Sequence, residues 1–167
     1  LKIEINRLKD QGVKGLVIDL RNNGGGSLKT VVDMAGMFIE SGPVVQVKYF
    51  DKEKQVLRDR DRSILWRGPL VILVNEGSAS ASEILAAAMQ DYERAIIIGG
   101  NQTWGKGTVQ NVFPLNRMVR GNTKGDLGAL RYTTQKYYRV NGGSVQLEGV
   151  KSDINLPNDL LNLFEEG

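Results

Sequence analysis

The sequence predicts an α/β fold in which helices form layers against a mixed β-sheet. Two strand–loop–helix units occupy the first half of the chain, at 15–40 and 69–91, and strands that pair locally occupy the second half. The 167 residues, 41% hydrophobic and 25% charged, suffice for one domain with a sizeable core. We therefore expect a single domain without an internal repeat.

The first unit follows a short amphipathic helix. Apolar residues recur at helical spacing over the first ten residues, and Gly12 is a plausible end of that helix. The apolar run 15–20 predicts a buried strand, and the Gly-rich stretch 21–26 a loop leaving it. The wide apolar face of 27–40 then predicts a helix.

A hairpin separates this unit from the second one. Alternating residues at 44–50 and 54–58 predict two paired strands, which we expect outside the core. The apolar run 69–74 predicts the strand of the second unit, and the small-residue stretch 77–91 its turn and helix. A third buried strand is predicted at 95–99.

The second half of the chain alternates between loops and strands. A Gly-rich loop at 100–108 precedes β-branched residues at 108–113, and the alternating run 128–139 predicts a further strand. Asn141-Gly142 predicts a hairpin turn. A short terminal helix is predicted over Asp159–Glu165, after Pro157.

Composition excludes several kinds of chemistry. The chain has no histidine and no cysteine, which removes the Ser-His-Asp triad, the thiol nucleophile and the usual zinc ligands. We therefore expect no metal and no cofactor. The net charge of +3 comes from 22 basic and 19 acidic residues that are interspersed, so we expect no nucleic-acid partner. The apolar runs are too short for an integral membrane segment.

Ser80 lies on the turn of the second unit. A serine there can be presented at a sheet edge, where the free N–H groups of the helix start can bind a developing negative charge. Ser80 and Glu83 also have the S-x-x-E spacing of a capping box, which by itself indicates only the start of a helix. Both interpretations stay open at this point.

Lys106 lies in a glycine-rich loop for which the sequence suggests two functions, phosphate binding and general-base catalysis. Gly100-x-x-x-x-Gly105-Lys106 is most of a phosphate-binding loop, but Gly107 and a strand-like segment follow where that motif needs Ser or Thr and a helix. A lysine can act as a general base in an apolar pocket, which the flanking glycines and Trp104 could help to form. The alternative is an exposed lysine on a turn.

The loop 21–26 supplies a third candidate element. Consecutive glycines at a strand end can turn backbone N–H groups inward as half of an oxyanion hole, with the N–H of Ala81 as the other half. The alternative is a flexible turn into a helix. A nucleophile candidate, a base candidate and an anion-binding loop thus all fall between core elements.

Four motifs follow one another in the chain: Asp19–Gly26, Gly77–Ile84, Gln90–Asp91 and Gly105–Gln110. Together they resemble the C-terminal processing peptidases. The triple glycine Gly24–Gly26 and the segments Tyr132–Arg139 and Val140–Gly143 resemble the bacterial periplasmic tail-specific proteases in particular. The resemblance runs from about residue 15 to 157 and implies a crotonase/ClpP-like α/β fold. It also implies a serine endopeptidase with a Ser/Lys dyad and no cofactor.

The resemblance implies a role for each site residue. Ser80 matches the nucleophile, Lys106 the general base, and Gln110 the residue that positions the lysine. Backbone N–H groups of Ala81, Gly25 and Gly26 would form the oxyanion hole.

This chain has one residue more than the family spacing between Ser80 and Lys106. Asp91 would lie roughly 16 Å from Ser80 along a helix, so we interpret it as structural. A straight strand from Lys106 to Gln110 would keep those two side chains apart, so the role of Gln110 requires a bend.

The resemblance also implies a biological setting. Family members cleave proteins or peptides near an apolar C-terminal tail, usually with a PDZ domain, in the bacterial periplasm or cell envelope. We expect residues 1–167 to be the peptidase core domain, without the PDZ domain and flanking helical regions of the intact protein. The alternative is a catalytically silent core or binding fragment, whose active-site loops are misplaced without those regions.

Overall fold

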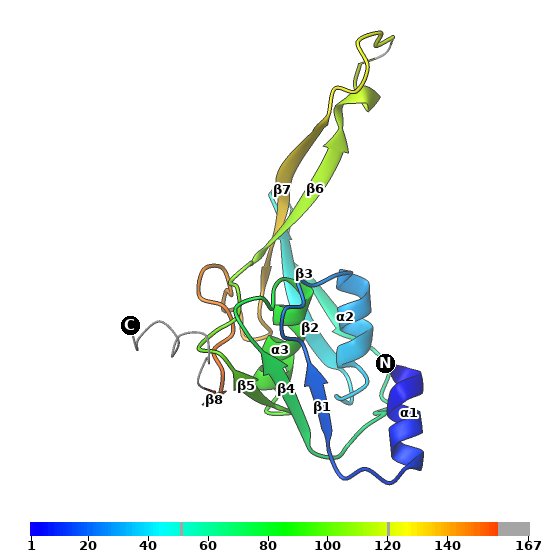
Figure 1. The fold of residues 1–167 in the computed structure, drawn as a ribbon, viewed down its shortest axis with the longest axis vertical. Helices are drawn as coiled ribbons and strands as arrows, with labels where there is room; N and C mark the ends of the chain where they lie inside the picture. Colours follow the sequence, from blue (N-terminus) through cyan, green and yellow to red (C-terminus); the bar gives the residue numbers. More distant parts are fainter. Residues whose placement is uncertain (51, 120, 157–167) are drawn as a thin grey trace, which may run out of the picture.

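The computed structural model describes residues 1–50, 52–119 and 121–156. Their strands form two four-stranded sheets, shown in Figure 1. The parallel sheet has the order β1-β4-β5-β8, with β1 (Leu16–Asp19), β4 (Leu70–Val74), β5 (Ile96–Gly99) and β8 (Ile154–Asn155). The antiparallel sheet has the order β3-β2-β7-β6, with β2 (Gly42–Tyr49), β3 (Gln55–Asp59), β6 (Thr108–Pro114) and β7 (Ala129–Tyr138).

Helix α3 (Ala81–Asp91) is the central element of the core. All nine residues from Ala81 to Met89 are buried, and the helix contacts β5 of one sheet and β2 of the other. A helix buried on every side must be apolar or small all round, and three consecutive alanines, Ala86–Ala88, meet that requirement. The parallel strands turn one face inward, with Leu70, Ile72 and Val74 buried in alternation.

Three shorter helices complete the described fold. They are α1 (Lys2–Asp10), α2 (Leu28–Ala35) and the 3₁₀ turn η1 (Leu115–Arg117). The side chain of Ser27 caps α2 by accepting a hydrogen bond from the N–H of Thr30 at 3.4 Å. None of the helices in the described ranges combines the length and the apolar character needed to cross a membrane. The predicted helix Asp159–Glu165 lies outside the described residues.

The α/β layered prediction is confirmed, with the parallel and antiparallel strands separated into two sheets. The prediction that the 44–58 hairpin lies outside the core is wrong for β2. Val44, Val45 and Val47 are each only 1% exposed. The reason is that β2 pairs with both β3 and β7 and also contacts α3. A bulge between Pro43 and Val45 lets two consecutive valines be buried.

Two further boundaries differ from the sequence-based expectation. Helix α2 ends at Ala35 rather than near residue 40, although Phe38 and Ile39 beyond it are buried. Their apolar side chains pack in the core from turns, which a helical pattern cannot distinguish from another turn of helix. Asn141-Gly142 does form a turn, with the Gly142 N–H donating to Arg139 O at 3.0 Å, but no strand follows within the described residues 143–150.

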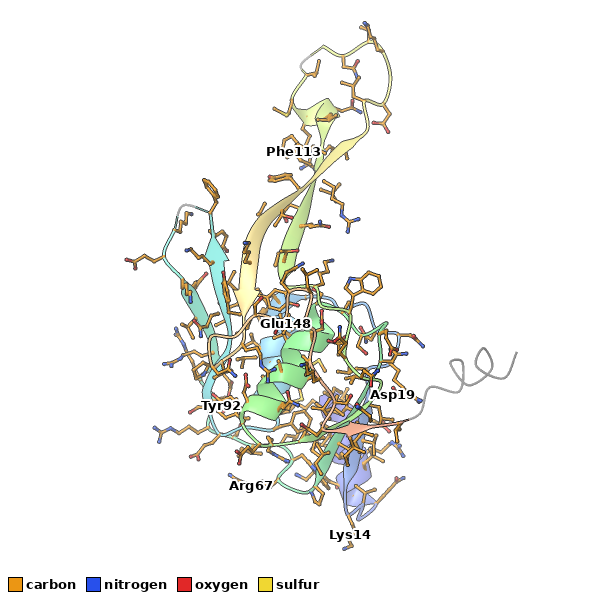
Figure 2. All side chains as sticks on the ribbon, turned by 90° about the vertical axis from the view of Figure 1, so that its left-hand side faces the viewer. Lys14, Asp19, Arg67, Tyr92, Phe113 and Glu148 are labelled. Atoms are coloured by element: carbon orange, nitrogen blue, oxygen red, sulfur yellow. The ribbon has the colours of Figure 1, made fainter. Side chains whose placement is uncertain are left out.

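Strands β6 and β7 extend beyond the body of the molecule as a long arm (Figure 1). In Figure 2, Phe113 lies out on this arm, far from Arg67 and Lys14 at the opposite end. The two strands pair from Thr108–Lys136 to Pro114–Ala129, interrupted by a bulge between Val109 and Gln110. The root of the arm therefore lies next to the loop that carries Lys106.

The end of α3 distant from Ser80 is fixed by an ion pair. Arg139 donates two hydrogen bonds to the Asp91 carboxylate, at 2.7 and 3.2 Å, and Asn141 donates a third at 2.9 Å. The pair is largely buried, with side chains 18% and 8% exposed. The structural interpretation of Asp91 is thereby confirmed, because its carboxylate is used to fasten β7 to the helix end.

Replacing Arg139 with Gln should lower the free energy of unfolding by about 3 kcal/mol, because it leaves the Asp91 carboxylate buried without its cation. Lys29→Gln is the matched control, since the Lys29–Asp33 pair is exposed and should change stability by less than about 0.5 kcal/mol. Urea unfolding followed by circular dichroism measures both. Equal effects of the two substitutions would contradict a buried, stabilising pair.

Candidate active site

Ser80 is the N-cap of α3 and has an unusual backbone conformation. Its φ is 57° and its ψ is −114°, a region that residues other than glycine rarely occupy. The turn before it is fixed by the Ser78 hydroxyl, which donates a hydrogen bond to Leu20 O at 2.8 Å and accepts one from the Asn75 N–H at 3.0 Å. The strand end and the helix start thus force the chain through a sharp elbow that presents Ser80, which is half-buried.

The carboxylate of Glu83 connects Ser80 to the Lys106 loop. Glu83 is fully buried and accepts hydrogen bonds from the N–H of Ser80 at 2.8 Å and from the N–H of Lys106 at 2.9 Å. It also accepts from the Gly105 N–H at 2.7 Å and the Thr103 hydroxyl at 2.6 Å. The capping contact that the sequence indicates is present, and the same side chain holds the base-candidate loop against the helix start.

The glycines beside Lys106 are needed for close packing. Gly105 has a φ of +85°, and a Cβ there would lie 3.0–3.1 Å from the backbone of Leu147. A Cβ on Gly107 would lie 2.9 Å from Gln146, whose side chain accepts a hydrogen bond from the Gly107 N–H at 2.8 Å. The flanking glycines therefore let the loop lie directly against the 146–147 segment.

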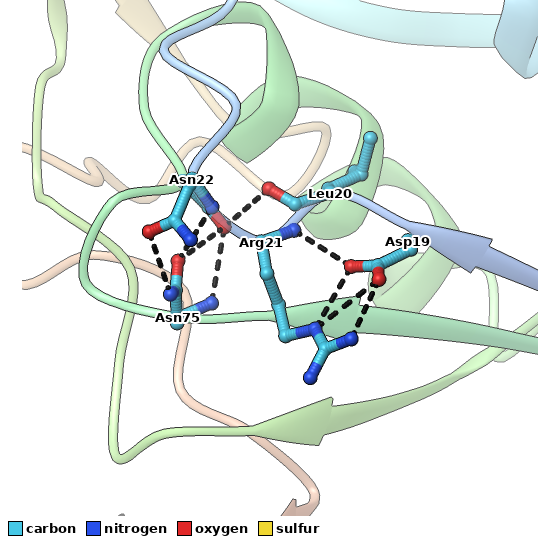
Figure 3. Close-up of polar contacts among 6 residues, drawn as sticks. Asp19, Leu20, Arg21, Asn22 and Asn75 are labelled. Carbon is cyan, nitrogen blue, oxygen red and sulfur yellow. Dashed lines mark hydrogen bonds and ion pairs between the residues drawn. The ribbon is translucent and has the colours of Figure 1, made fainter. Parts of the chain in front are cut away.

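The loop after β1 lies directly against the Ser80 elbow. Its Asn22 and the Asn75 side chain exchange hydrogen bonds at 2.8 and 3.0 Å, drawn in Figure 3 beside the exposed Asp19–Arg21 ion pair. The Ala79 N–H donates to Asn23 O at 3.0 Å. These contacts fix two loops more than fifty residues apart in sequence as one surface.

The three predicted oxyanion groups come together at this surface. Gly25 has a φ of +99°, and a Cβ there would lie 2.8 Å from the nitrogen of Ala81. The N–H groups of Gly26 and Ala81 have no hydrogen-bond partner among the described residues. The N–H of Gly25 instead donates to the Asn23 side chain at 3.0 Å. Two of the three donors are therefore free to bind an anion.

A cavity of roughly 140 Å³ opens beside these groups. It lies between the Gly25–Ser27 loop and the first turns of α3, and its exposed lining is mainly apolar. Helix α2 and the segment after β1 also contribute to the wall, which is formed by Leu20, Asn23, Gly25, Gly26, Ser27, Thr30, Val31, Met34, Ala81, Ser82 and Leu85. An apolar side chain of moderate size fits such a space.

The surroundings of Lys106 differ from the expectation in one respect. Trp104 is 66% exposed and does not enclose Lys106, which is half-buried. Strand β6 begins only at Thr108, so a strand rather than a helix follows the lysine, as expected against a phosphate-binding loop. The Gln110 side chain is exposed, and among the described residues no hydrogen bond joins it to Lys106 or joins Lys106 Nζ to Ser80 Oγ.

Residues 1–156 match peptidase family S41. The chain belongs to this family. It is 52% identical over 161 residues to the tail-specific protease of Haemophilus influenzae, covering 96% of this chain and 23% of that protein. It is 36% identical over 160 residues to the chloroplastic C-terminal processing peptidase of Tetradesmus obliquus, covering 96% and 32%.

A solved structure agrees with the S41 assignment. The photosystem II D1 C-terminal processing protease superposes with a TM-score of 0.78 at 35% identity, covering 93% of this chain and 38% of that one. The predicted resemblance to C-terminal processing peptidases is therefore confirmed, and with it the fold class. The S41 chain spans about a quarter to a third of the length of the curated relatives named above.

Sequence reasoning missed two residues of this S41 site. Glu83 was recognised only as a capping residue, and Tyr137 only as part of an alternating strand. The Tyr137 hydroxyl hydrogen-bonds to Lys106 O and lies 3.3 Å from Ser80 O. Burial, followed by the negative charge of Glu83, raises the pKa of Tyr137 well above its usual value. The only signal in the sequence was the position of Tyr137, whose polar hydroxyl group lies on an inward-facing side chain of a predicted strand.

Glu83→Gln should destabilise the S41 chain by about 3 kcal/mol or more, because an amide offers one acceptor atom where four donors converge and adds two donors of its own. Urea unfolding measures the loss, and Glu148→Gln, on an exposed residue, is the control. A stability change below about 0.5 kcal/mol in Glu83→Gln would contradict the contacts described for this carboxylate.

Gly25→Ala should reduce acylation of Ser80, the nucleophile expected from the resemblance, at least a hundredfold, because the new Cβ meets Ala79 O at 2.6 Å and Ala81 N at 2.8 Å. Gly24→Ala is the matched control, since a Cβ there has nothing within 4 Å. Labelling with a serine-reactive fluorophosphonate gives both rates. Equal labelling of the two variants would remove Gly25 from the site.

Proposed function

We propose that this chain is the catalytic core of a serine endopeptidase that processes proteins near their C-terminus. Ser80 is the nucleophile and Lys106 the general base. The observation that carries the proposal is that one buried carboxylate, that of Glu83, accepts hydrogen bonds from the backbone N–H groups of both residues. This arrangement holds the two at a fixed separation, beside N–H groups free to bind an anion.

The chemistry follows from those roles. The neutral amine of Lys106 accepts the hydroxyl proton of Ser80 as Oγ attacks the scissile carbonyl carbon. The N–H groups of Ala81, Gly26 and Gly25 stabilise the oxyanion, with Gly25 released from Asn23 as the substrate enters. The protonated lysine then returns its proton to the leaving amine. Water hydrolyses the acyl-enzyme by the same route in reverse, with Lys106 again the base.

Gln110 is retained as the proposed partner of the lysine amine. Lys106 precedes β6 and is separated from it by Gly107, and the bulge between Val109 and Gln110 departs from the straight strand that would keep the side chains apart. A bend at this position is what the role requires. The contact would form through rearrangement of the two side chains, because Glu83 holds the backbone of the Lys106 loop in place.

The cavity beside the oxyanion groups supports a substrate class. Its mainly apolar walls favour an aliphatic side chain on the residue before the scissile bond, and its volume of roughly 140 Å³ disfavours a tryptophan. The flanking residues of the substrate would bind as an extended strand, because main-chain pairing tolerates varied sequence. These features suit an unstructured, apolar C-terminal tail.

The proposal extends to the setting of the chain. The chain spans 23% of the tail-specific protease of H. influenzae, so we propose that 1–167 is the peptidase core of an intact protein that also carries a PDZ domain and flanking helical regions. We place that protein in the bacterial periplasm or cell envelope, by resemblance. Its partners would be proteins or peptides with apolar C-termini.

A second candidate function is a catalytically silent core or binding fragment. Two observations favour it: Asn23 occupies the N–H of Gly25, and no hydrogen bond joins the Ser80 and Lys106 side chains among the described residues. In this case the loops would reach a catalytic arrangement only with the flanking regions present.

The test uses a fluorogenic peptide with a free C-terminus and a single alanine, valine, aspartate or tryptophan before the scissile bond. The 1–167 chain and a longer chain with its natural neighbours should both cleave after alanine and valine at least tenfold faster than after the other two. Ser80→Ala and Lys106→Ala should abolish cleavage. Cleavage by the longer chain alone would favour the second candidate, and cleavage retained in both variants would exclude the dyad.

A further inference from the structure

Tyr137 is held on a rigid element at the edge of the site. Its side chain is 2% exposed, and its backbone pairs with Val47 of β2 on one side. On the other side its N–H donates to Gly107 O at 3.0 Å, directly after Lys106. A residue fixed by neighbours on both sides of a sheet can place its side chain more precisely than a residue on a loop.

The phenol hydroxyl contacts the backbone of both candidate catalytic residues. It donates to Lys106 O and lies 3.3 Å from Ser80 O, so one hydroxyl bridges two segments that are 26 residues apart in sequence. A buried tyrosine hydroxyl needs a hydrogen-bond partner, but either carbonyl alone would satisfy it. Contact with both makes the separation of the two carbonyls depend on Tyr137.

This contact is complementary to that of Glu83. Glu83 accepts hydrogen bonds from the N–H groups of Ser80 and Lys106, and Tyr137 contacts the carbonyl groups of the same two residues. With both peptide groups of each residue held, the orientation as well as the distance of the two Cα–Cβ bonds is fixed. Ser80 O also accepts a hydrogen bond from the N–H of Ile84 at 3.0 Å, so the helix fixes Ser80 as well, and the Tyr137 hydroxyl ties the carbonyl of Lys106 to this fixed point.

We propose that Tyr137 is a positioning residue of the Ser80/Lys106 site, setting the approach of the base candidate to the nucleophile through their carbonyl groups. The inference rests on the proposed function and extends it by one residue. The burial and the nearby Glu83 charge that raise the pKa of Tyr137 also keep its proton in place, so the phenol remains a donor at neutral and alkaline pH.

The test compares Tyr137→Phe with Tyr138→Phe. The first removes only the bridging hydroxyl and keeps the buried ring. The second removes the hydroxyl of the next residue, whose ring lies under the Lys54 ammonium at 4.8 Å rather than at the site. With the fluorogenic alanine peptide, Tyr137→Phe should lower kcat at least tenfold with KM within about twofold, and Tyr138→Phe should change neither. A wild-type kcat in Tyr137→Phe, with only a lowered thermal midpoint, would make Tyr137 a packing residue and overturn the proposal.

A second measurement does not depend on catalysis. In hydrogen-exchange mass spectrometry of the 1–167 chain, Tyr137→Phe should raise amide exchange at least fivefold in both 78–84 and 103–108, relative to wild type and Tyr138→Phe. Exchange unchanged in either segment would overturn the positioning role. Absence of cleavage in the wild-type chain would count against the proposed function, while the exchange result would still decide the role of Tyr137.

Discussion

The buried carboxylate of Glu83 is the constraint on which the site depends. It is a negative charge without an ion-pairing cation among the described residues, and it is stable there because four donors surround it. Three of those donors belong to the loop 103–106 and one to Ser80. The loop cannot move away from the helix start without leaving the carboxylate unsatisfied, so the folding energy of the core also maintains the geometry of the site.

Helix α3 connects the Glu83 contacts to the rest of the core. Because its small residues let it pack between two sheets, its first turn is largely buried at the wall of the cavity, and its last turn is fastened to the end of β7 by Asp91 and Arg139. Strand β7 in turn carries Tyr137 back to the start of the same helix. Helix and strand therefore hold each other at both ends, which is the kind of rigid support that a catalytic arrangement requires.

The predictions from sequence succeeded where the cause is local. Short apolar runs located β1, β4 and β5, the small-residue stretch after β4 located α3, and motif resemblance placed the chain in its family. They failed where the outcome depends on distant partners. The burial of β2 follows from its pairing with β7, ninety residues away, and the helix predicted to residue 40 ends early because apolar turns can be buried as well as helices.

For the site, the amino-acid sequence by itself determined the chemical groups: a serine at a strand–helix turn, a lysine between glycines, and a glycine-rich loop, with no histidine to compete. Only the tertiary structure decided their relation. Segments near residues 25, 80, 106 and 137 converge through hydrogen bonds in which at least one partner is a backbone N–H or C=O group. Nearly every residue carries these groups, so no pattern of side chains could reveal which of them would meet. The capping role of Glu83 could be predicted from the sequence. Its three further hydrogen-bond donors, in the loop 103–106, could not be predicted, because only the fold brings that loop close to Glu83.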